Sequence, residues 1–179
     1  MRYSQHPHYR DLPPKRFGIP VFGKRRAFLH GSRVYKQILI AVDLTEAAST
    51  VVLEHAAGIA ESDSTTHVLH VVEPQYVQYS MDPTLTGSMT RDLEQTAVAN
   101  ATERLAELCK AYGIPPEAQH VRLGRAAHEV HAAAQELDAD LIVIGSHGYH
   151  GWRNILGSTA NAVLHGTPVD TLVALLPRT

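Results

Sequence analysis

Residues 140–159, DLIVIGSHGYHGWRNILGST, constrain the fold of this 179-residue chain more than any other segment. The apolar run from Leu141 to Gly145 predicts a buried strand, and a short helical pattern begins at Ser158. A loop between the carboxyl end of a strand and the amino end of a helix is where α/β proteins bind phosphate groups. Glycines let a ligand or another backbone approach such a loop closely. Four occur here: Gly145, Gly148, Gly151 and Gly157.

This segment therefore predicts a nucleotide-sized anion as the ligand. Ser158 and Thr159 either cap the helix or donate their hydroxyls to the anion. Arg153 either adds positive charge or is a solvated loop residue. Two better-known phosphate loops are excluded, because neither GxxxxGK[ST] nor GxGxxG occurs in the chain.

Strand and helix patterns alternate from about residue 35 onward. The continuous apolar run 38–42 is typical of a strand covered on both faces, and Thr45 offers an N-cap for the next helix. Such alternation predicts a single, Rossmann-like α/β domain: a doubly wound parallel sheet with helices on both faces. We expect strands at 38–42, 66–72, 119–123, 141–145 and 171–176, helices at 47–59, 89–112, 125–137 and 158–164, and a long loop at 73–88.

The charge distribution divides the chain into a basic arm and an acidic body. Residues 1–36 hold nine Lys or Arg and one acid, whereas the remainder holds seven basic and seventeen acidic side chains. We interpret residues 1–34 as a flexible extension and residues 35–179 as the folded domain. The arm either binds nucleic acid, ribosomal RNA, a membrane surface or an acidic patch on a partner, or is a dispensable extension.

Composition points to a cytoplasmic protein. The chain is 44% apolar and 19% charged, without an apolar run of the roughly 20 residues that a membrane helix needs. Its polar, proline-rich amino terminus does not match a secretory signal. Cys109 is the single cysteine, which excludes an internal disulfide and fits a reducing compartment.

Asp43 is the most informative polar residue outside the glycine segment. It follows the first strand, where open α/β sheets bind ligands, so it either contacts a ribose hydroxyl or a metal-bound phosphate, or simply forms the turn before the helix. The glycine loop favours the first role. Among twelve histidines, we single out His147, which lies inside that loop and could orient it or contact a phosphate. We predict no metal centre and no catalytic residues, because clustered ligands and a GxSxG elbow are both missing.

Three stretches together carry a family resemblance: YKQILIAVDLT, LHVVEP and DLIVIGSHGYHGWRNILGSTANAVLHGTPVDTLVALL. Over residues 35–177 the chain resembles the universal stress protein family, in its UspA-like form. The resemblance implies a five-stranded sheet of order 3-2-1-4-5, homodimers formed through the last strand, and ATP bound together with Mg²⁺ or Mn²⁺ carried by the nucleotide. It implies a stress-responsive regulator rather than an enzyme, although slow ATPase activity is compatible with it.

The family's nucleotide pattern, G-x2-G-x9-G-[ST], matches this chain with one departure. Only eight residues separate Gly148 from Gly157, where the pattern has nine. The alternative is therefore a dimeric scaffold that binds no nucleotide and docks on RNA, a ribosome or a regulatory protein through residues 1–36. The expected nucleotide contacts are Ala41, Val42, Asp43, Val71, Gly145, His147, Gly148, Gly157, Ser158 and Thr159.

Overall fold

The computed structural model describes residues 34–74, 87–146, 157–167 and 169–176. Every predicted strand and helix is present, and each boundary falls within two residues of the prediction. The elements in chain order are β1 (Gln37–Ala41), α1 (Glu46–Ile59), β2 (Thr65–Val72), α3 (Gly87–Tyr112), the 3₁₀ turn η2 (Pro116–Ala118), β3 (Gln119–Leu123), α4 (Ala126–Glu136), β4 (Leu141–Ser146), α5 (Ser158–Leu164) and β5 (Asp170–Leu175).

The five strands form one parallel sheet of order β3-β2-β1-β4-β5, which confirms the predicted fold class. β1 is the central strand and pairs with both β2 and β4. The chain first builds the sheet from β1 towards β3 and then crosses to the other side with β4. Ligands of open α/β sheets bind at the carboxyl ends of the strands where this reversal occurs. That point lies between β1 and β4.

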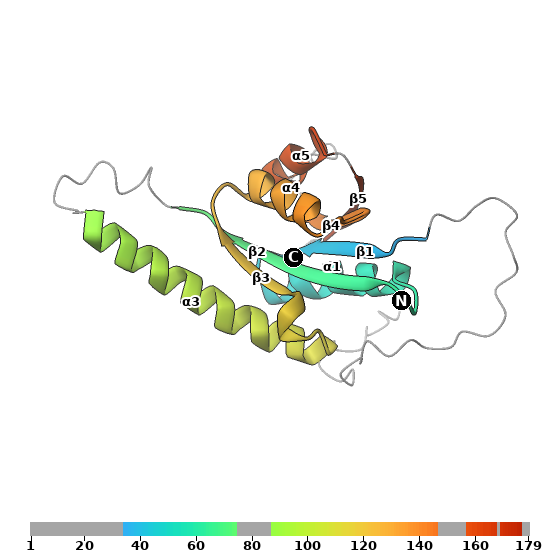
Figure 1. Cartoon of the computed structure of the whole chain (residues 1–179), viewed down its shortest axis with the longest axis horizontal. Coiled ribbons are helices and arrows are strands. Elements are labelled where there is room, and N and C mark those ends of the chain that lie inside the picture. The colour runs from blue at the N-terminus through green and yellow to red at the C-terminus, as the bar shows by residue number, and fades with distance from the viewer. Residues whose placement is uncertain (1–33, 75–86, 147–156, 168, 177–179) are drawn as a thin grey trace, which may run out of the picture.

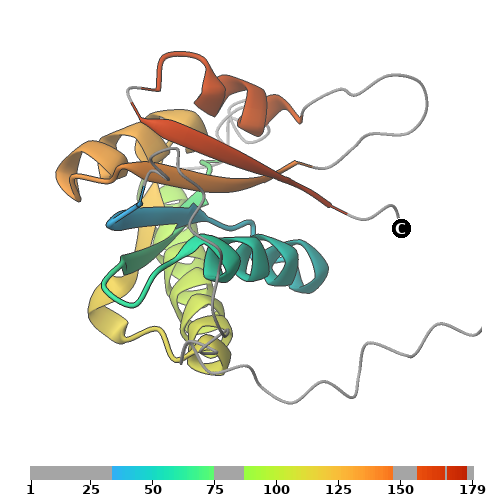
Figure 2. The same cartoon turned by 90° about the vertical axis from the view of Figure 1, so that its right-hand side faces the viewer.

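Helices cover both faces of the sheet. Figures 1 and 2 show α1 and α3 on one side and α4 and α5 on the other. Successive β1 side chains alternate between the two hydrophobic clusters: Ile38 and Ile40 pack with α1 and α3, and Leu39 packs with α4 and α5. All three side chains are fully buried, which explains why β1 is continuously apolar rather than alternating.

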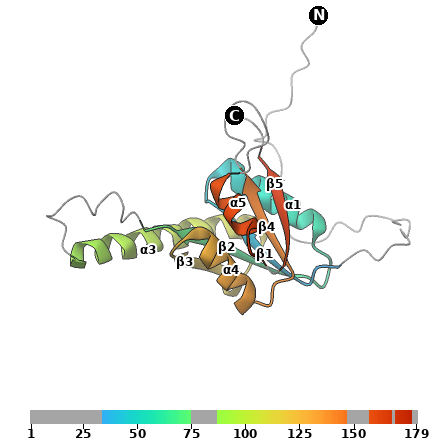
Figure 3. The ribbon, with the colours of Figure 1, turned by 90° about the horizontal axis from the view of Figure 1, so that it is seen from above.

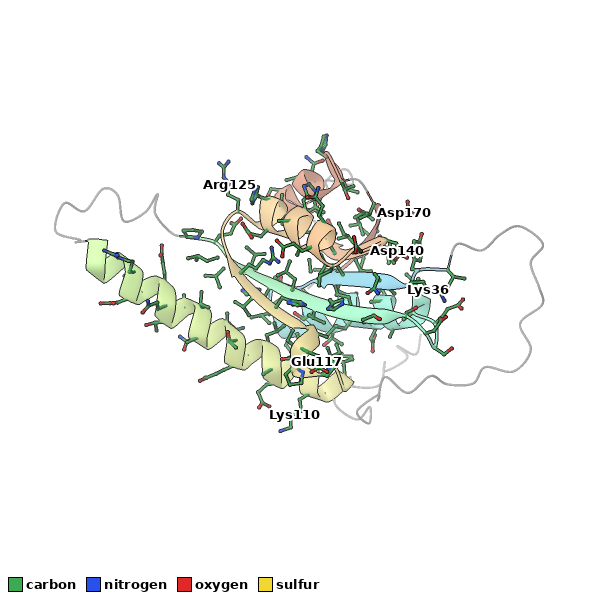
Figure 4. The ribbon with its side chains drawn as sticks, viewed as in Figure 1. Lys36, Lys110, Glu117, Arg125, Asp140 and Asp170 are labelled. Atoms are coloured by element: carbon green, nitrogen blue, oxygen red, sulfur yellow. The ribbon has the colours of Figure 1, made fainter. Side chains whose placement is uncertain are left out.

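Carboxylates hold the amino end of the sheet together (Figure 4). Asp140, just before β4, accepts hydrogen bonds from the backbone N–H of Lys36 at 2.8 Å and of Gln37 at 3.1 Å. Tyr35 donates its hydroxyl to Asp170 at 2.9 Å. These contacts tie the start of β1 to β4 and β5. The amino end is therefore closed by the protein's own groups.

The helix starts differ from the predicted capping. Thr45 occupies the N-cap position of α1 but makes no side-chain cap, because its Oγ1 donates instead to Asp43 Oδ1 at 2.8 Å. Gly157 is the N-cap of α5, so the proposed cap by Ser158 or Thr159 is not formed. At the start of α4, the N–H of Ala126 has no acceptor within the helix and donates instead, at 2.9 Å, to Oε1 of Glu73, a residue far away in the sequence.

The start of α3 and the strand β5 lie at the periphery of the fold. The amino-terminal part of α3 projects past the other helices and strands in Figures 1 and 3. β5 forms one edge of the sheet and crosses the front of Figure 2. Within the described ranges, no helix combines the length and the apolar character needed to cross a membrane.

Candidate functional site

A cavity of about 230 Å³ opens at the carboxyl edge of the sheet. Ligand pockets for whole drug-sized molecules are typically about 300–1,000 Å³, so this cavity matches one end of a nucleotide rather than all of it. It lies at the reversal of strand order, where the sequence predicted a site. Its lining comprises Ala41 at the end of β1, with Val42 and Asp43 after it; Leu69, His70 and Val71 from β2, with Glu73 after it; Ala48, Ser49 and Val52 from α1; Ala126 and Val130 from α4; and Ile144, Gly145, Thr159 and Leu176.

Asp43 is both a turn residue and a cavity residue, so its place in the turn is compatible with the predicted ligand contact. Its Oδ1 accepts the backbone N–H of Thr45 at 2.9 Å as well as the Thr45 hydroxyl. Leu44 between them has a left-handed φ of 62°, an uncommon conformation for a branched side chain. Arg104 of α3 donates to the Leu44 carbonyl at 2.7 Å, and the Leu44 side chain is buried in the core. The turn that contains Asp43 is thus held in place by the hydrogen bond from Arg104 and by the burial of Leu44.

Val71 lies just past the end of β1. Ala41, the last residue of β1, pairs with Leu69, and the Val42 N–H donates to the Leu69 carbonyl at 2.9 Å. Backbone groups alternate in direction along a strand, so the N–H and C=O of Val71 point to the same side as those of Leu69. They point towards the cavity beyond β1, at a position where β1 supplies no paired residue.

Val42 lines the cavity, but its backbone N–H and carbonyl both have partners within the protein. Its N–H is taken by Leu69, and its carbonyl lies 2.9 Å from Nδ1 of His70. A carbonyl acceptor fixes the His70 tautomer that carries its proton on Nδ1. The Val42 side chain itself is buried in the core.

Gly145 has a packing reason for lacking a side chain. A Cβ atom there would lie 2.9 Å from Cγ2 of Val52, closer than real Cβ contacts, and 3.6 Å from the Leu176 methyl groups. The glycine therefore lets α1 pack closely on β4. This explanation is independent of ligand approach, the reason predicted from the sequence.

The two described ends of the glycine segment contact each other. The Gly157 N–H donates to Oγ of the buried Ser146 at 3.1 Å. Gly157 has φ −54° and ψ 152°, a conformation open to other residues. Ser158 begins α5 but is not among the cavity residues, whereas Thr159 is. The predicted contacts His147 and Gly148 lie outside the described residues.

Three polar cavity residues were missed by the sequence analysis: Ser49, His70 and Glu73. His70 and Glu73 stand in the LHVVEP stretch, which was used only as a family signature. Ser49 interrupts a buried apolar stripe of α1 that includes Ala48, Val52 and Ala56. A polar residue within a buried stripe was the available signal. Ser49 is 1% exposed, and its Oγ has no hydrogen-bond partner among the described residues.

The electrostatic character of the cavity is acidic. Asp43 and Glu73 are its charged lining residues, and no Lys or Arg is among the described residues that line it. Carboxylates accept hydrogen bonds from ribose hydroxyls or amino groups and attract cations. A bare phosphate would be repelled unless it arrived with a cation.

A second polar cluster lies away from the cavity. Nδ1 of His67 on β2 is 3.2 Å from Nε2 of His120 on β3. Burial lowers the pKa of both rings, and the neighbouring His67 and Arg122 lower the pKa of His120 further. Arg122 in turn pairs with Glu136 of α4. In the part of the chain that the structure describes, no three His, Cys, Asp or Glu side chains gather as metal ligands.

The sequence model of the universal stress protein family matches residues 34–174. The chain belongs to the universal stress protein family. Universal stress protein A homolog 1 of Coxiella burnetii is 39% identical over 138 residues, which cover 77% of this chain and 94% of that protein. Universal stress protein G of Escherichia coli O157:H7 is 34% identical over 143 residues, covering 78% and 99%. Both relatives are matched over nearly their whole length.

Solved structures agree on the fold of this universal stress protein. The hypothetical protein MJ0577 superimposes with a TM-score of 0.66 at 19% identity, over 82% of this chain and all of that one. Universal stress protein UspA from Lactobacillus plantarum gives a TM-score of 0.56 at 24% identity, over 80% and 99%. At these identities the likeness concerns the fold alone.

Proposed function

We propose that this universal stress protein binds an adenine nucleotide at the carboxyl edge of its sheet and acts as a stress-responsive regulator. One observation carries the proposal. Asp43, Val71, Gly145 and Thr159 come from four separate segments of the sequence, and all line one cavity at the reversal of strand order. The sequence and its family resemblance predict all four as nucleotide contacts.

The base end of the ligand fits the β2 side of the cavity. The backbone N–H and C=O of Val71 point past the end of β1, and an adenine ring offers both an acceptor nitrogen and an amino group to such a pair. Ala41, Leu69 and Val130 supply apolar surface there. This combination of apolar walls and a few placed polar groups is characteristic of small-molecule sites.

The ribose and phosphate end fits the side of Asp43 and Thr159. Asp43 accepts hydrogen bonds from ribose hydroxyls, and its position is fixed by the turn to Thr45. Phosphates extend over the edge towards Gly157, Ser158 and Thr159, and in this proposal they also contact His147 and Gly148. A Mg²⁺ or Mn²⁺ ion carried by ATP offsets the repulsion from Asp43 and Glu73.

A titration of the full chain tests the proposal. We expect a fluorescent ATP analogue to bind in the presence of Mg²⁺, and unlabelled ATP to displace it. Asp43→Asn keeps the Oδ1 acceptor of the turn and removes the charge, so we expect affinity to fall about tenfold with little loss of stability. Asp63→Asn is the matched control, because Asp63 is exposed and pairs with Lys36 at the opposite end of the sheet. Absence of binding by ATP, ADP and adenosine at millimolar concentration would refute the proposal.

The spacing within the glycine segment favours one alternative. Eight residues between Gly148 and Gly157, rather than nine, shift one end of the loop relative to the other. If this shift misplaces the phosphate contacts, the protein is a dimeric scaffold without a nucleotide. The same titration decides between the two, since the scaffold would bind neither the fluorescent analogue nor ATP.

We further propose a homodimer formed through β5. β5 is an edge strand, and the Leu175 side chain is 73% exposed on it. An exposed edge that carries a large apolar side chain is a pairing surface unless something covers it. Light scattering should report a dimer for the native chain and a monomer for Leu175→Lys. A native monomer would contradict the assignment.

A further inference from the structure

Ser49 is the most anomalous polar residue in the described part of the chain. It lies in the second half of the first turn of α1, where its N–H donates to the Thr45 carbonyl at 2.9 Å. The side chain is 1% exposed, and Oγ makes no hydrogen bond with any described residue. Buried hydroxyls in native proteins are nearly always hydrogen-bonded, so an exception calls for an explanation.

Packing alone does not explain this serine. Ala48, Val52 and Ala56 make the rest of this buried helix face apolar, and alanine would fill the same space as serine without an unpaired hydroxyl. Alanine is also the better helix former. A polar group that lowers the stability of the free protein points to a partner that is present only when the protein works.

The surroundings of Ser49 identify where that partner would be. Ser49 lines the cavity, and Val52, about one turn further along α1, is the residue that contacts Gly145 on β4. α1 packs against β1, β4 and β5. Ser49 is thus on the β4 side of the cavity, which leads into the glycine segment, and not beside Val71 on β2. Rotation about one χ1 bond moves Oγ between its staggered positions around the cavity wall.

We propose that Ser49 is a ligand-binding residue whose hydroxyl donates a hydrogen bond to an oxygen of the ribose–phosphate part of the nucleotide. The inference rests on the proposed function and deepens it. It adds a polar contact from α1 to the site. A serine there leaves the empty protein with an unsatisfied hydroxyl, and the nucleotide relieves that cost on binding.

Ser49→Ala tests this through two readouts measured on the full chain. The melting temperature of the ligand-free variant should equal or exceed that of the native protein, because an unpaired hydroxyl has been removed. Affinity for ATP with Mg²⁺ should fall about tenfold, the value of one lost hydrogen bond. Thr50→Ala is the matched control: it removes a hydroxyl from the next residue of α1, which is not a cavity residue, and should leave ATP affinity unchanged.

Adenosine distinguishes the two sources of the ligand oxygen. If Ser49→Ala weakens adenosine and ATP alike, the acceptor is a ribose oxygen; if it weakens ATP alone, the acceptor is a phosphate oxygen. Equal ATP affinity of the variant and the native chain would overturn the inference while leaving nucleotide binding intact. A lowered melting temperature of the ligand-free variant would also overturn it, since the hydroxyl would then be structural. A native chain that binds no nucleotide would instead refute the proposed function itself.

Discussion

The contact between Gly145 and Val52 yields the most quantitative prediction. A Cβ atom at Gly145 would lie 2.9 Å from Cγ2 of Val52, whereas ordinary contacts begin at 3.4 Å. Val52 is buried in the core and its β-branched side chain cannot swing away. Gly145→Ala is therefore an overpacking substitution, which costs about 1–3 kcal/mol of unfolding free energy. At roughly 2–4 °C per kcal/mol for a chain of this size, the melting temperature should fall by about 2–12 °C.

A double-mutant cycle identifies Val52 as the cause. Val52→Ala alone removes two buried methyl groups, at about 0.8 kcal/mol each plus a cavity term, and should cost roughly 2 kcal/mol. In that background the clash is gone, so adding Gly145→Ala should cost almost nothing. The two substitutions together should therefore cost about 1–3 kcal/mol less unfolding free energy than the sum of their separate costs.

Urea unfolding followed by circular dichroism measures all four free energies. Gly58→Ala is the control, because Gly58 is an exposed residue within α1 where a Cβ would meet nothing within 4 Å. That substitution should stabilise the protein by about 0.5–1 kcal/mol. If Gly145→Ala proved neutral, or cost the same with and without the Val52 methyl groups, the packing explanation for this glycine would be wrong.

Four further outcomes follow from the described contacts. Leu44→Gly should destabilise the protein in urea unfolding, because losing a buried leucine costs about 2–5 kcal/mol and relieving the left-handed φ returns only about 1–2; a more stable variant would contradict this. Arg104→Met removes the donor to the Leu44 carbonyl and should weaken ATP binding through the Asp43 turn, whereas unchanged affinity would show that the turn holds itself. Burial lowers the pKa of His67 and His120 in the folded state, so near and below the ordinary value of 6.5 the unfolded chain binds more protons than the folded chain. The unfolding free energy should accordingly fall as the pH drops below 6.5, less steeply in His120→Gln, and parallel curves for the two proteins would exclude the pair as the cause. Burial raises the pKa of the Cys109 thiol to about 11, so a thiol reagent at pH 8 should react only after urea unfolds the chain; rapid labelling of the folded protein would contradict the buried position.

Strands and helices were predictable because their signals are local. A strand covered on both faces must be apolar throughout, as β1 is, and a helix must end where Gly113 adopts a φ of 67°. Asp43 and Gly145 were found by the same logic, because each stands at the carboxyl end of an apolar run. The strand order was supplied by the family resemblance, since alternation alone indicates a parallel sheet without ordering its strands.

The other features of the fold and the site depend on which residues, far apart in the sequence, contact each other in the folded chain. That Gly145 is a glycine because of Val52, that Glu73 caps α4, and that His67 approaches His120 are pairings across 53 to 93 positions of the chain. Ser49 was not predicted as a site residue, because a serine in a helix is common and only the structure shows that its hydroxyl is buried without a partner among the described residues. Local patterns record how a residue sits on its own element, whereas packing and hydrogen bonding are properties of pairs, and only the folded chain decides which pairs exist.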